Sequence, residues 1–192
     1  MRVIGGIYRG RRLRTVSGLA VRPTSDRLRE TLFNILARRI HGCQFLDICA
    51  GSGAVGIEAL SRGASSVVFV EEDGQSAEII ECNLAKTKLK GRIRQQDAFD
   101  FLGHASGSEL FDIVFADPPY EKTEKGERFT EKLLANEELP QLMGADGILV
   151  LEKWPAEAVP QMKQWLLVRQ KTYGATEVLF LSRSPQSKIR NP

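Results

Sequence analysis

The sequence predicts an α/β protein whose mostly parallel sheet is covered by helices on both faces. Strand-like and helix-like segments alternate along most of the 192 residues. The strand-like segments are continuous apolar runs, which are typical of strands buried on both faces. A different pattern closes the chain, because two strand-like segments within 165–183 meet at a Tyr-Gly-Ala-Thr turn. These two segments should pair antiparallel, so we expect a parallel sheet with an antiparallel hairpin at its edge.

The individual elements follow from hydrophobic periodicity and from the positions of glycine and proline. The first is a helix over 26–39, with Thr24 or Ser25 as its cap and with Asp26 and Glu30 early, where the helix dipole favours acids. Apolar runs predict strands at 44–50, 66–71, 92–97, 110–116 and 147–153, and amphipathic stretches predict helices at 54–63, 74–89, 98–104, 128–137 and 156–164. We expect a basic arm or hairpin over 1–24, one folded domain over 25–184 and a polar tail over 185–192.

Composition and cysteine usage exclude several classes of protein. The chain is 42% hydrophobic and 27% charged, as expected for one globular domain. It begins without the apolar segment of a signal peptide, and no stretch approaches the ~18 to 20 apolar residues that span a bilayer, so we expect a soluble, cytoplasmic protein. Cys43, Cys49 and Cys82 show no C-x-x-C spacing and are expected to be reduced thiols. With only His41 and His104 and no clustered ligands, no metal site is expected.

The net charge of +3 is unevenly distributed along the chain. Residues 1–30 contain eight arginines against Asp26 and Glu30, whereas acids are in excess in the remainder. Because guanidinium groups match phosphates in shape and charge, this arm predicts nucleic-acid binding, although a solvated surface could carry the same bias. The arginines predicted to contact nucleic acid are Arg2, Arg9, Arg11, Arg12, Arg14, Arg22 and Arg27.

A glycine-rich loop between a predicted strand and a predicted helix indicates a cofactor site. Gly51-Ser52-Gly53-Ala54-Val55-Gly56 has the G-x-G-x-x-G spacing, which lets the backbone approach a ligand and directs free helix N–H groups toward it. Glu71 ends the next strand, where an acid can hydrogen-bond ribose hydroxyls. The loop therefore predicts a nucleoside-bearing cofactor, and its spacing alone also suits NAD.

Acids at the ends of three successive strands favour S-adenosylmethionine as that cofactor. The molecule has an ammonium group, a ribose and an adenine, but no phosphate. Asp47 could hold the ammonium, Glu71 the ribose hydroxyls, and Asp97 the adenine amine. Each acid could instead cap the following helix, as Asp97 could at 98–104. An NAD-dependent oxidoreductase is the alternative at this stage.

The run Asp117-Pro118-Pro119-Tyr120 after the strand at 110–116 predicts the site of chemistry. The prolines must end the strand and stiffen the turn, and the parallel sheet should place this turn at the same edge as the glycine loop. The Asp117 carboxylate and the Pro118 carbonyl could accept from both N–H groups of an exocyclic base amine and favour the positive charge that develops on its nitrogen. Tyr120 could stack on the base. A rigid structural turn is the alternative, and the chemistry does not choose between bases.

The chain also resembles a known family, the bacterial RsmD-type methyltransferases, which methylate the N2 amine of a guanine in 16S ribosomal RNA. The resemblance is carried by RVIGGIYRGRRL, RPTSDRLRETLFNIL, FLDICAGSGAVGIEALSRGA, VEED and DIVFADPPY, which together span nearly the whole chain. It implies a class I, Rossmann-like methyltransferase fold with a seven-stranded sheet, preceded by a small basic N-terminal element. It also implies 16S rRNA as partner, either as naked RNA or within a small ribosomal subunit.

The resemblance assigns roles to matching positions. Residues along the methionine and ribose of the cofactor would be Asp47, Ala50, Gly51, Ser52 and Gly53; Glu71 would bind the ribose, Asp97 and Ala98 the adenine, and Asp117, Pro118, Pro119 and Tyr120 the target base. Arg22, Thr24 and Arg27 would form a lid near the methionine end of the cofactor or contact RNA. Three alternatives remain, namely methylation of another amine such as adenine N6 in DNA or RNA, an NAD-dependent oxidoreductase as the more distant one, and a non-enzymatic RNA-binding factor on the same scaffold.

Overall fold

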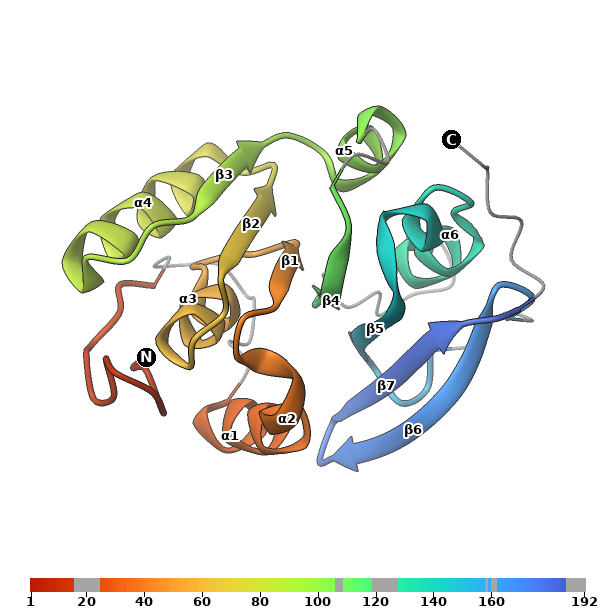
Figure 1. The fold of residues 1–192 in the computed structure, drawn as a ribbon, viewed down its shortest axis with the longest axis horizontal. Helices are drawn as coiled ribbons and strands as arrows, with labels where there is room; N and C mark the ends of the chain where they lie inside the picture. Colours follow the sequence, from red (N-terminus) through yellow and green to blue (C-terminus); the bar gives the residue numbers. More distant parts are fainter. Residues whose placement is uncertain (16–24, 106–108, 119–127, 158, 160–161, 186–192) are drawn as a thin grey trace.

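The computed structural model describes residues 1–15, 25–105, 109–118, 128–157, 159 and 162–185. Seven strands form one sheet in the order β3-β2-β1-β4-β5-β7-β6 (Figure 1). The strands are β1 (Gln44–Ile48), β2 (Ser66–Glu71), β3 (Arg92–Gln95), β4 (Phe111–Ala116), β5 (Met143–Lys153), β6 (Trp165–Tyr173) and β7 (Thr176–Arg183). Strands β1 to β5 pair in parallel, and β7 pairs antiparallel with both β5 and β6. The predicted parallel sheet with an antiparallel hairpin, the class I methyltransferase fold, is confirmed.

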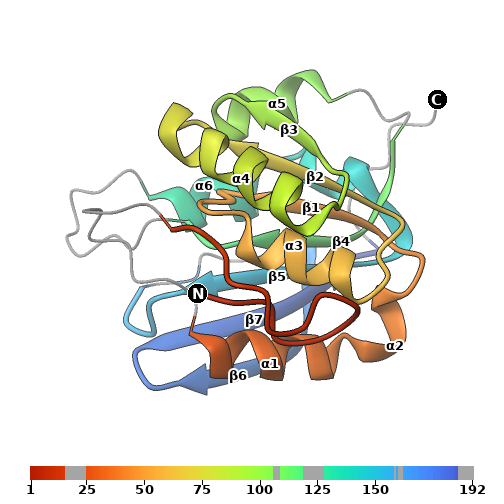
Figure 2. The ribbon, with the colours of Figure 1, turned by 90° about the vertical axis from the view of Figure 1, so that its left-hand side faces the viewer.

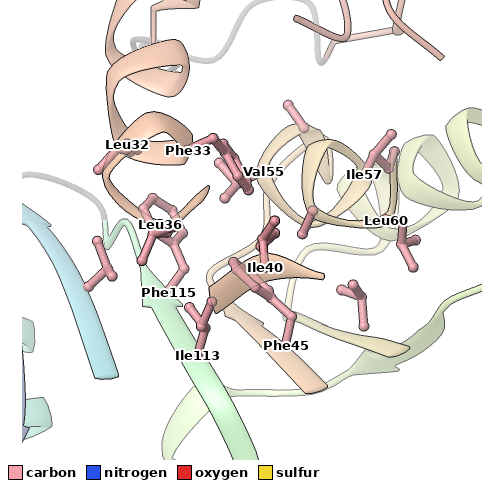
Figure 3. Close-up of a cluster of buried hydrophobic side chains, with 14 of the residues drawn as sticks. Leu32, Phe33, Leu36, Ile40, Phe45, Val55, Ile57, Leu60, Ile113 and Phe115 are labelled. Carbon is pink, nitrogen blue, oxygen red and sulfur yellow. The ribbon is translucent and has the colours of Figure 1, made fainter. Parts of the chain in front are cut away.

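Helices cover both faces of this sheet because successive strand residues point to opposite sides. They are α1 (Asp26–Ile35), α2 (Ala37–Ile40), α3 (Ala54–Ser61), α4 (Gly74–Thr87), α5 (Ala98–His104), α6 (Phe129–Ala135) and the 3₁₀ helix η1 (Leu139–Leu142). On one face, α1 to α4 bury Phe45, Ile113 and Phe115, which belong with Phe33 and Val55 to the cluster drawn in Figure 3. On the other face, α5, α6 and η1 pack on the alternate strand residues.

Two predicted helices differ from the structure. The helix expected over 26–39 begins at Asp26, with the Ser25 hydroxyl accepting from the Leu28 N–H at 3.2 Å, but it is interrupted at Leu36, where ψ is −1°. The helix predicted over 156–164 is wrong, because none of the described residues in that range is helical. Pro160 lies inside the predicted range, and a proline removes a backbone donor that a helix interior needs.

The C-terminal hairpin forms as its turn sequence predicts. Tyr173 pairs with Thr176, which leaves Gly174 and Ala175 as a two-residue loop. Gly174, the first of these two loop residues, has a φ of +61°, and two-residue hairpin loops favour glycine where φ is positive. Because β6 is the outer strand, the hairpin ends the sheet at the edge opposite β3 (Figure 1).

The N-terminal residues lie along α3 as a docked loop with one antiparallel bridge, between Arg2 and Arg12 (Figure 2). The buried carboxylate of Glu58 accepts from the N–H groups of Ile4 and Gly5, each at 2.7 Å. Gly6 has a φ of +76°, and a Cβ added there would lie 1.8 Å from the Ser61 carbonyl oxygen. Glycine is therefore required where the loop crosses the end of α3.

In the part of the chain that the structure describes, no helix is both long enough and apolar enough to cross a bilayer.

Candidate active site

The predicted cofactor and reaction residues come together at the carboxyl edge of the parallel strands. Ile48 at the end of β1 lies in register with Val70 of β2 and Ala116 of β4. The glycine loop after β1, Glu71 at the end of β2 and Asp117 after β4 therefore leave the sheet on the same side. Asp97 follows β3, whose Gln95 is in register with Glu71. The topology thus brings together residues that lie as far as 70 positions apart in the sequence.

Glu71 is joined directly to the glycine loop. Its Oε2 atom accepts from the Gly51 N–H at 2.6 Å, and its Oε1 atom accepts from the Asp73 N–H at 3.0 Å. Gly51 and Gly53 both have positive φ, +55° and +74°, so the loop adopts a backbone conformation that favours glycine. Half-buried Glu71 thus lies between the loop and the segment that enters α4.

Asp47 lies beneath the loop, and its side chain is almost completely buried. Its Oδ2 atom accepts from the Gly56 N–H in the first turn of α3 at 2.8 Å. Burial raises the pKa of Asp47 to about 8, opposed by the Gly56 hydrogen bond and reinforced by the charge of Glu71. Gly56 itself allows α3 to pack closely on β2, since a Cβ there would lie 2.3 Å from the Phe69 ring.

The carboxylates of three strand ends converge on Cys49, the residue between Asp47 and the loop. Burial raises the pKa of the Cys49 thiol well above its usual value, and Glu71, Asp117, Asp47 and Glu72 raise it further through their charges. Cys49 also has a φ of +58°, a left-handed conformation that is uncommon for a residue with a side chain. The edge of the sheet beside the loop is therefore a region of negative potential, which suits a cationic ligand.

Asp97 adopts the capping role that was the alternative for it. Its Oδ1 atom accepts from the N–H groups of Phe99 and Asp100 at 2.7 and 3.0 Å and so caps α5. Ala98, the first residue of α5, is buried in the apolar core on the face of the sheet that α5, α6 and η1 cover. The cap occupies Oδ1, and the adenine contact of Asp97 and Ala98 stays a prediction.

The residues predicted to hold the target base fall partly outside the described structure. Asp117 is half-buried and Pro118 is buried directly after β4. Pro119 and Tyr120 lie outside the described residues, as do Arg22 and Thr24. Asp117 directly follows Ala116, which is in register with Ile48 at the end of β1, so Asp117 leaves the sheet beside the glycine loop.

The arginines of the arm are not equivalent. Arg9, Arg11, Arg12, Arg14 and Arg27 are exposed, and Arg2 is exposed while pairing with Asp26 at 3.0 Å. Arg29, which the charge count for residues 1–30 includes, is fully buried and binds the Asp26 carboxylate at 2.7 Å and the Arg2 carbonyl at 2.8 Å. Burial raises the pKa of Asp26, but the hydrogen bonds and charges of these two arginines outweigh that effect and lower it. Arg29 therefore belongs to the core rather than to the basic surface.

Two polar residues that join the arm to the domain were missed from the sequence. One is Glu58, which also forms an ion pair with Arg62 at 2.7 Å. In the sequence, a lone acid within the otherwise apolar AVGIEAL stretch indicates such a buried, paired carboxylate. The other is Asn83, which is fully buried. Its Oδ1 accepts from the Arg14 N–H at 2.7 Å, and its Nδ2 donates to the carbonyls of Arg14 and Ser52, both at 3.0 Å. Asn83 thus links the arm to the glycine loop.

Among the described residues, no three His, Cys, Asp or Glu side chains gather in a group that could hold a metal ion.

Comparisons with known proteins give matches over most of the chain. Residues 1–182 match the family described as Conserved hypothetical protein 95. The chain is similar to ribosomal RNA small subunit methyltransferase D of Haemophilus influenzae, with 35% identity covering 91% of this chain and 89% of that protein. The same enzyme of Escherichia coli (strain K12) is also 35% identical, covering 98% of this chain and 92% of that protein. Among solved structures, a hypothetical protein of Thermus thermophilus superposes with a TM-score of 0.79 at 31% identity, covering 95% of this chain and 99% of that one.

Proposed function

Because the chain belongs to the RsmD-type methyltransferases, the family described as Conserved hypothetical protein 95, we propose that it methylates the exocyclic N2 amine of a guanine in 16S ribosomal RNA. The chain is a methyltransferase that uses S-adenosylmethionine, and small-subunit ribosomal RNA is its substrate. The choice of guanine and of its N2 atom is the proposed part. With ribosomal RNA as substrate, the proposed site of action is the cytoplasm.

The observation that carries this proposal is the placement of Asp47, Glu71 and Asp117 at one edge of the sheet beside the glycine loop. S-adenosylmethionine carries a sulfonium and an ammonium group, and nearby carboxylates favour both cations. A dinucleotide would instead bring phosphates to the same edge, where the carboxylates would repel them. The charge of the site and the family membership therefore both favour the methyl donor over the NAD-dependent alternative.

We assign the cofactor contacts to residues at this edge. In the proposal, Ala50, Gly51, Ser52 and Gly53 lie along the cofactor, where the two positive-φ glycines permit close approach of the backbone. Glu71 accepts from the ribose hydroxyls, Asp97 with Ala98 binds the adenine, and Thr24 lies near the methionine end. Asp47 supports the loop from below through its hydrogen bond with the Gly56 N–H, and an ammonium group bound beside it would favour its ionised form. The cofactor, when bound, supplies an electrophilic methyl group.

The target amine would be held by the turn after β4. The lone pair of a guanine N2 is delocalised into the ring, so the amine is a weak nucleophile and gains positive charge as it attacks. The Asp117 carboxylate and the Pro118 carbonyl would accept from its two N–H groups and stabilise that charge. Pro119 would keep the turn rigid, and the Tyr120 ring would stack on a base turned out of the RNA.

The docked arm supports RNA as the substrate. The arm carries the exposed arginines Arg9, Arg11, Arg12 and Arg14, and it lies on the side of the molecule that carries α3 and α4 (Figure 2). Guanidinium groups on such a surface would bind phosphates and position the RNA without reading its bases. Arg2 and Arg27 would add to this surface, and Arg22 would bind either the cofactor or the RNA.

Mapping of methylated nucleotides tests the proposal directly. Purified protein would be incubated with labelled S-adenosylmethionine and with either naked 16S rRNA or small ribosomal subunits that lack the modification, and the product nucleotides would be identified by mass. We expect N2-methylguanosine at one position. Methylation of adenine N6 would favour the alternative amine, and tight RNA binding without any transfer would indicate a non-enzymatic factor.

A further inference from the structure

A run of exposed lysines follows the arm's contact with α4. Lys86, Lys88 and Lys90, here called the lysine ridge, lie at the end of α4 and in the segment that leads to β3. All three are exposed, and the sequence contains no acid between positions 82 and 96. Arg92 and Arg94 continue the run on β3, where Arg92 pairs with Glu109. The acids of α4, Glu78 and Glu81, lie earlier in the helix.

The middle lysine has a backbone conformation that normally selects glycine. Lys88 has a φ of +55° and follows the last residue of α4. The Lys88 N–H donates to the Ala85 carbonyl and the Leu89 N–H donates to the Leu84 carbonyl, both at 3.1 Å, which is the Schellman pattern that usually has glycine at this position. A left-handed conformation is strained for a residue with a Cβ, so stability alone would favour glycine there. A lysine at this position suggests a use for its charge.

The lysine ridge shares a surface with the arm. The Arg14 backbone is held by Asn83 of α4, and its Nη1 atom lies 3.6 Å from the Cys82 sulfur. Lys86 is four residues after Cys82, which places it on the same side of the helix one turn further on. The arm and α4 also lie side by side in Figures 1 and 2. Arg14 and Lys86 therefore lie on the same side of α4.

We propose that the lysine ridge binds phosphates of the RNA at a distance from the target nucleotide and extends the surface of the arm. The helix α4 begins at the site edge of the sheet, directly after β2, and its 14 residues span about 21 Å. The ridge lies at the far end, so it would contact RNA that flanks the target rather than the target itself. This inference rests on the proposed function, because it takes RNA as the substrate. Charges at a helix C-terminus can also simply complement the helix dipole, and the experiment separates the two roles.

Replacing Lys88 with glycine separates a role in binding from a role in folding. Glycine removes the charge and also the backbone strain, so Lys88→Gly should unfold at the same temperature as the unmodified protein or at a higher one. Its affinity for a long 16S rRNA fragment should nevertheless fall. The slope of log affinity against log salt should become shallower by about 1 for this variant, and by about 2 to 3 for Lys86→Gln/Lys88→Gly/Lys90→Gln. The matched control is Lys132→Gln on α6, an exposed lysine on the opposite face of the sheet, which should leave the slope unchanged.

Two further affinities complete the test. One is the affinity for a short RNA hairpin that contains the target nucleotide without the flanking RNA, and the other is the affinity for S-adenosylhomocysteine. Neither affinity should change in the triple variant, because the ridge lies far from both sites. If the folded triple variant binds the long fragment with unchanged affinity and salt slope, or if the short hairpin loses as much affinity as the long fragment, the proposal is wrong. Failure of the proposed function would look different, since the unmodified protein would then form no N2-methylguanosine in the RNA.

Discussion

The Glu71 carboxylate accepts a hydrogen bond from the Gly51 N–H at 2.6 Å, across the 20 residues that separate the end of β2 from the glycine loop. The acid predicted to bind the ribose is therefore already joined to the loop predicted to run along the cofactor. One carboxylate oxygen accepts from the Gly51 N–H of the loop and the other accepts from the Asp73 N–H, so two hydrogen bonds fix the orientation of the side chain.

Replacement of Glu71 should weaken cofactor binding. We expect Glu71→Ala to raise the dissociation constant for S-adenosylhomocysteine by about tenfold to a hundredfold, the size of a lost hydrogen bond to a charged group. Calorimetric titration measures this constant, and Glu78→Ala, which removes an exposed acid of α4, is the matched control. An unchanged constant for Glu71→Ala would argue against the ribose contact.

Replacement of Asp117 should instead abolish methyl transfer with little effect on the cofactor. The Asp117 carboxylate is proposed to stabilise charge that develops only during the reaction, and removal of one such group typically lowers the rate by about 10²- to 10³-fold. Transfer of labelled methyl to 16S rRNA under single-turnover conditions measures the rate, with Asp146→Ala, which removes an exposed acid of β5, as control. If Asp117→Ala transfers the methyl group at nearly the rate of the control, Asp117 does not stabilise the transition state.

Asp47 should make the stability of the fold depend on pH. Its pKa is raised from 3.8 to about 8, so between these values the folded state retains a proton that the unfolded state releases. The free energy of unfolding that Asp47 contributes should therefore be largest below pH 4, fall as the pH rises toward 8, and level off above it. Asp47→Asn keeps an acceptor for the Gly56 N–H but cannot ionise.

Urea unfolding of both proteins from about pH 5 to about pH 9 tests this expectation. The stability of Asp47→Asn relative to the unmodified protein should increase steadily up to about pH 8 and then remain constant. A constant difference across the whole range would mean that Asp47 is not buried in its neutral form.

Two glycines of the arm should respond differently to the same substitution. Gly6 and Gly10 both have positive φ, +76° and +84°, so alanine strains the backbone at either position by about 1 to 2 kcal/mol. Only at Gly6 would the new Cβ also meet the Ser61 carbonyl, whereas Gly10 has no atom within 4 Å of that position. Gly6→Ala should therefore release the arm from α3, and Gly10→Ala should not.

Limited trypsin digestion measures release of the arm, since the arm is rich in arginine. Gly6→Ala should be cleaved within residues 9–14 much faster than Gly10→Ala, and its RNA affinity should fall while its affinity for S-adenosylhomocysteine is retained. Equal cleavage of the two variants would show that contact with Ser61 does not hold the arm in place.

Elements with local patterns could be predicted from the amino-acid sequence. The strand Ser66–Glu71 and the helix Ala98–His104 begin and end where they were predicted, because a continuous apolar run and a capping acid are complete signals within a few residues. The G-x-G-x-x-G spacing and Asp117 also indicated the correct edge of the sheet, because parallel strands all end on one side. The helix expected at 156–164 does not form in the described residues of that range, whose sequence contains Pro160, a residue that disfavours a helix interior.

Which charged and polar groups are buried depends on the three-dimensional arrangement of the elements. Arg29 could not be distinguished from the exposed arginines around it, and the contacts of Glu58 and Asn83 join the arm to residues 53 to 69 positions away. The side chains of Glu58 and Asn83 are buried with partners from distant segments that satisfy their hydrogen bonds, and the residues next to them in the sequence do not identify those partners. The convergence of Asp47, Glu71 and Asp117 on Cys49 arises in the same way, from the order of strands in the sheet.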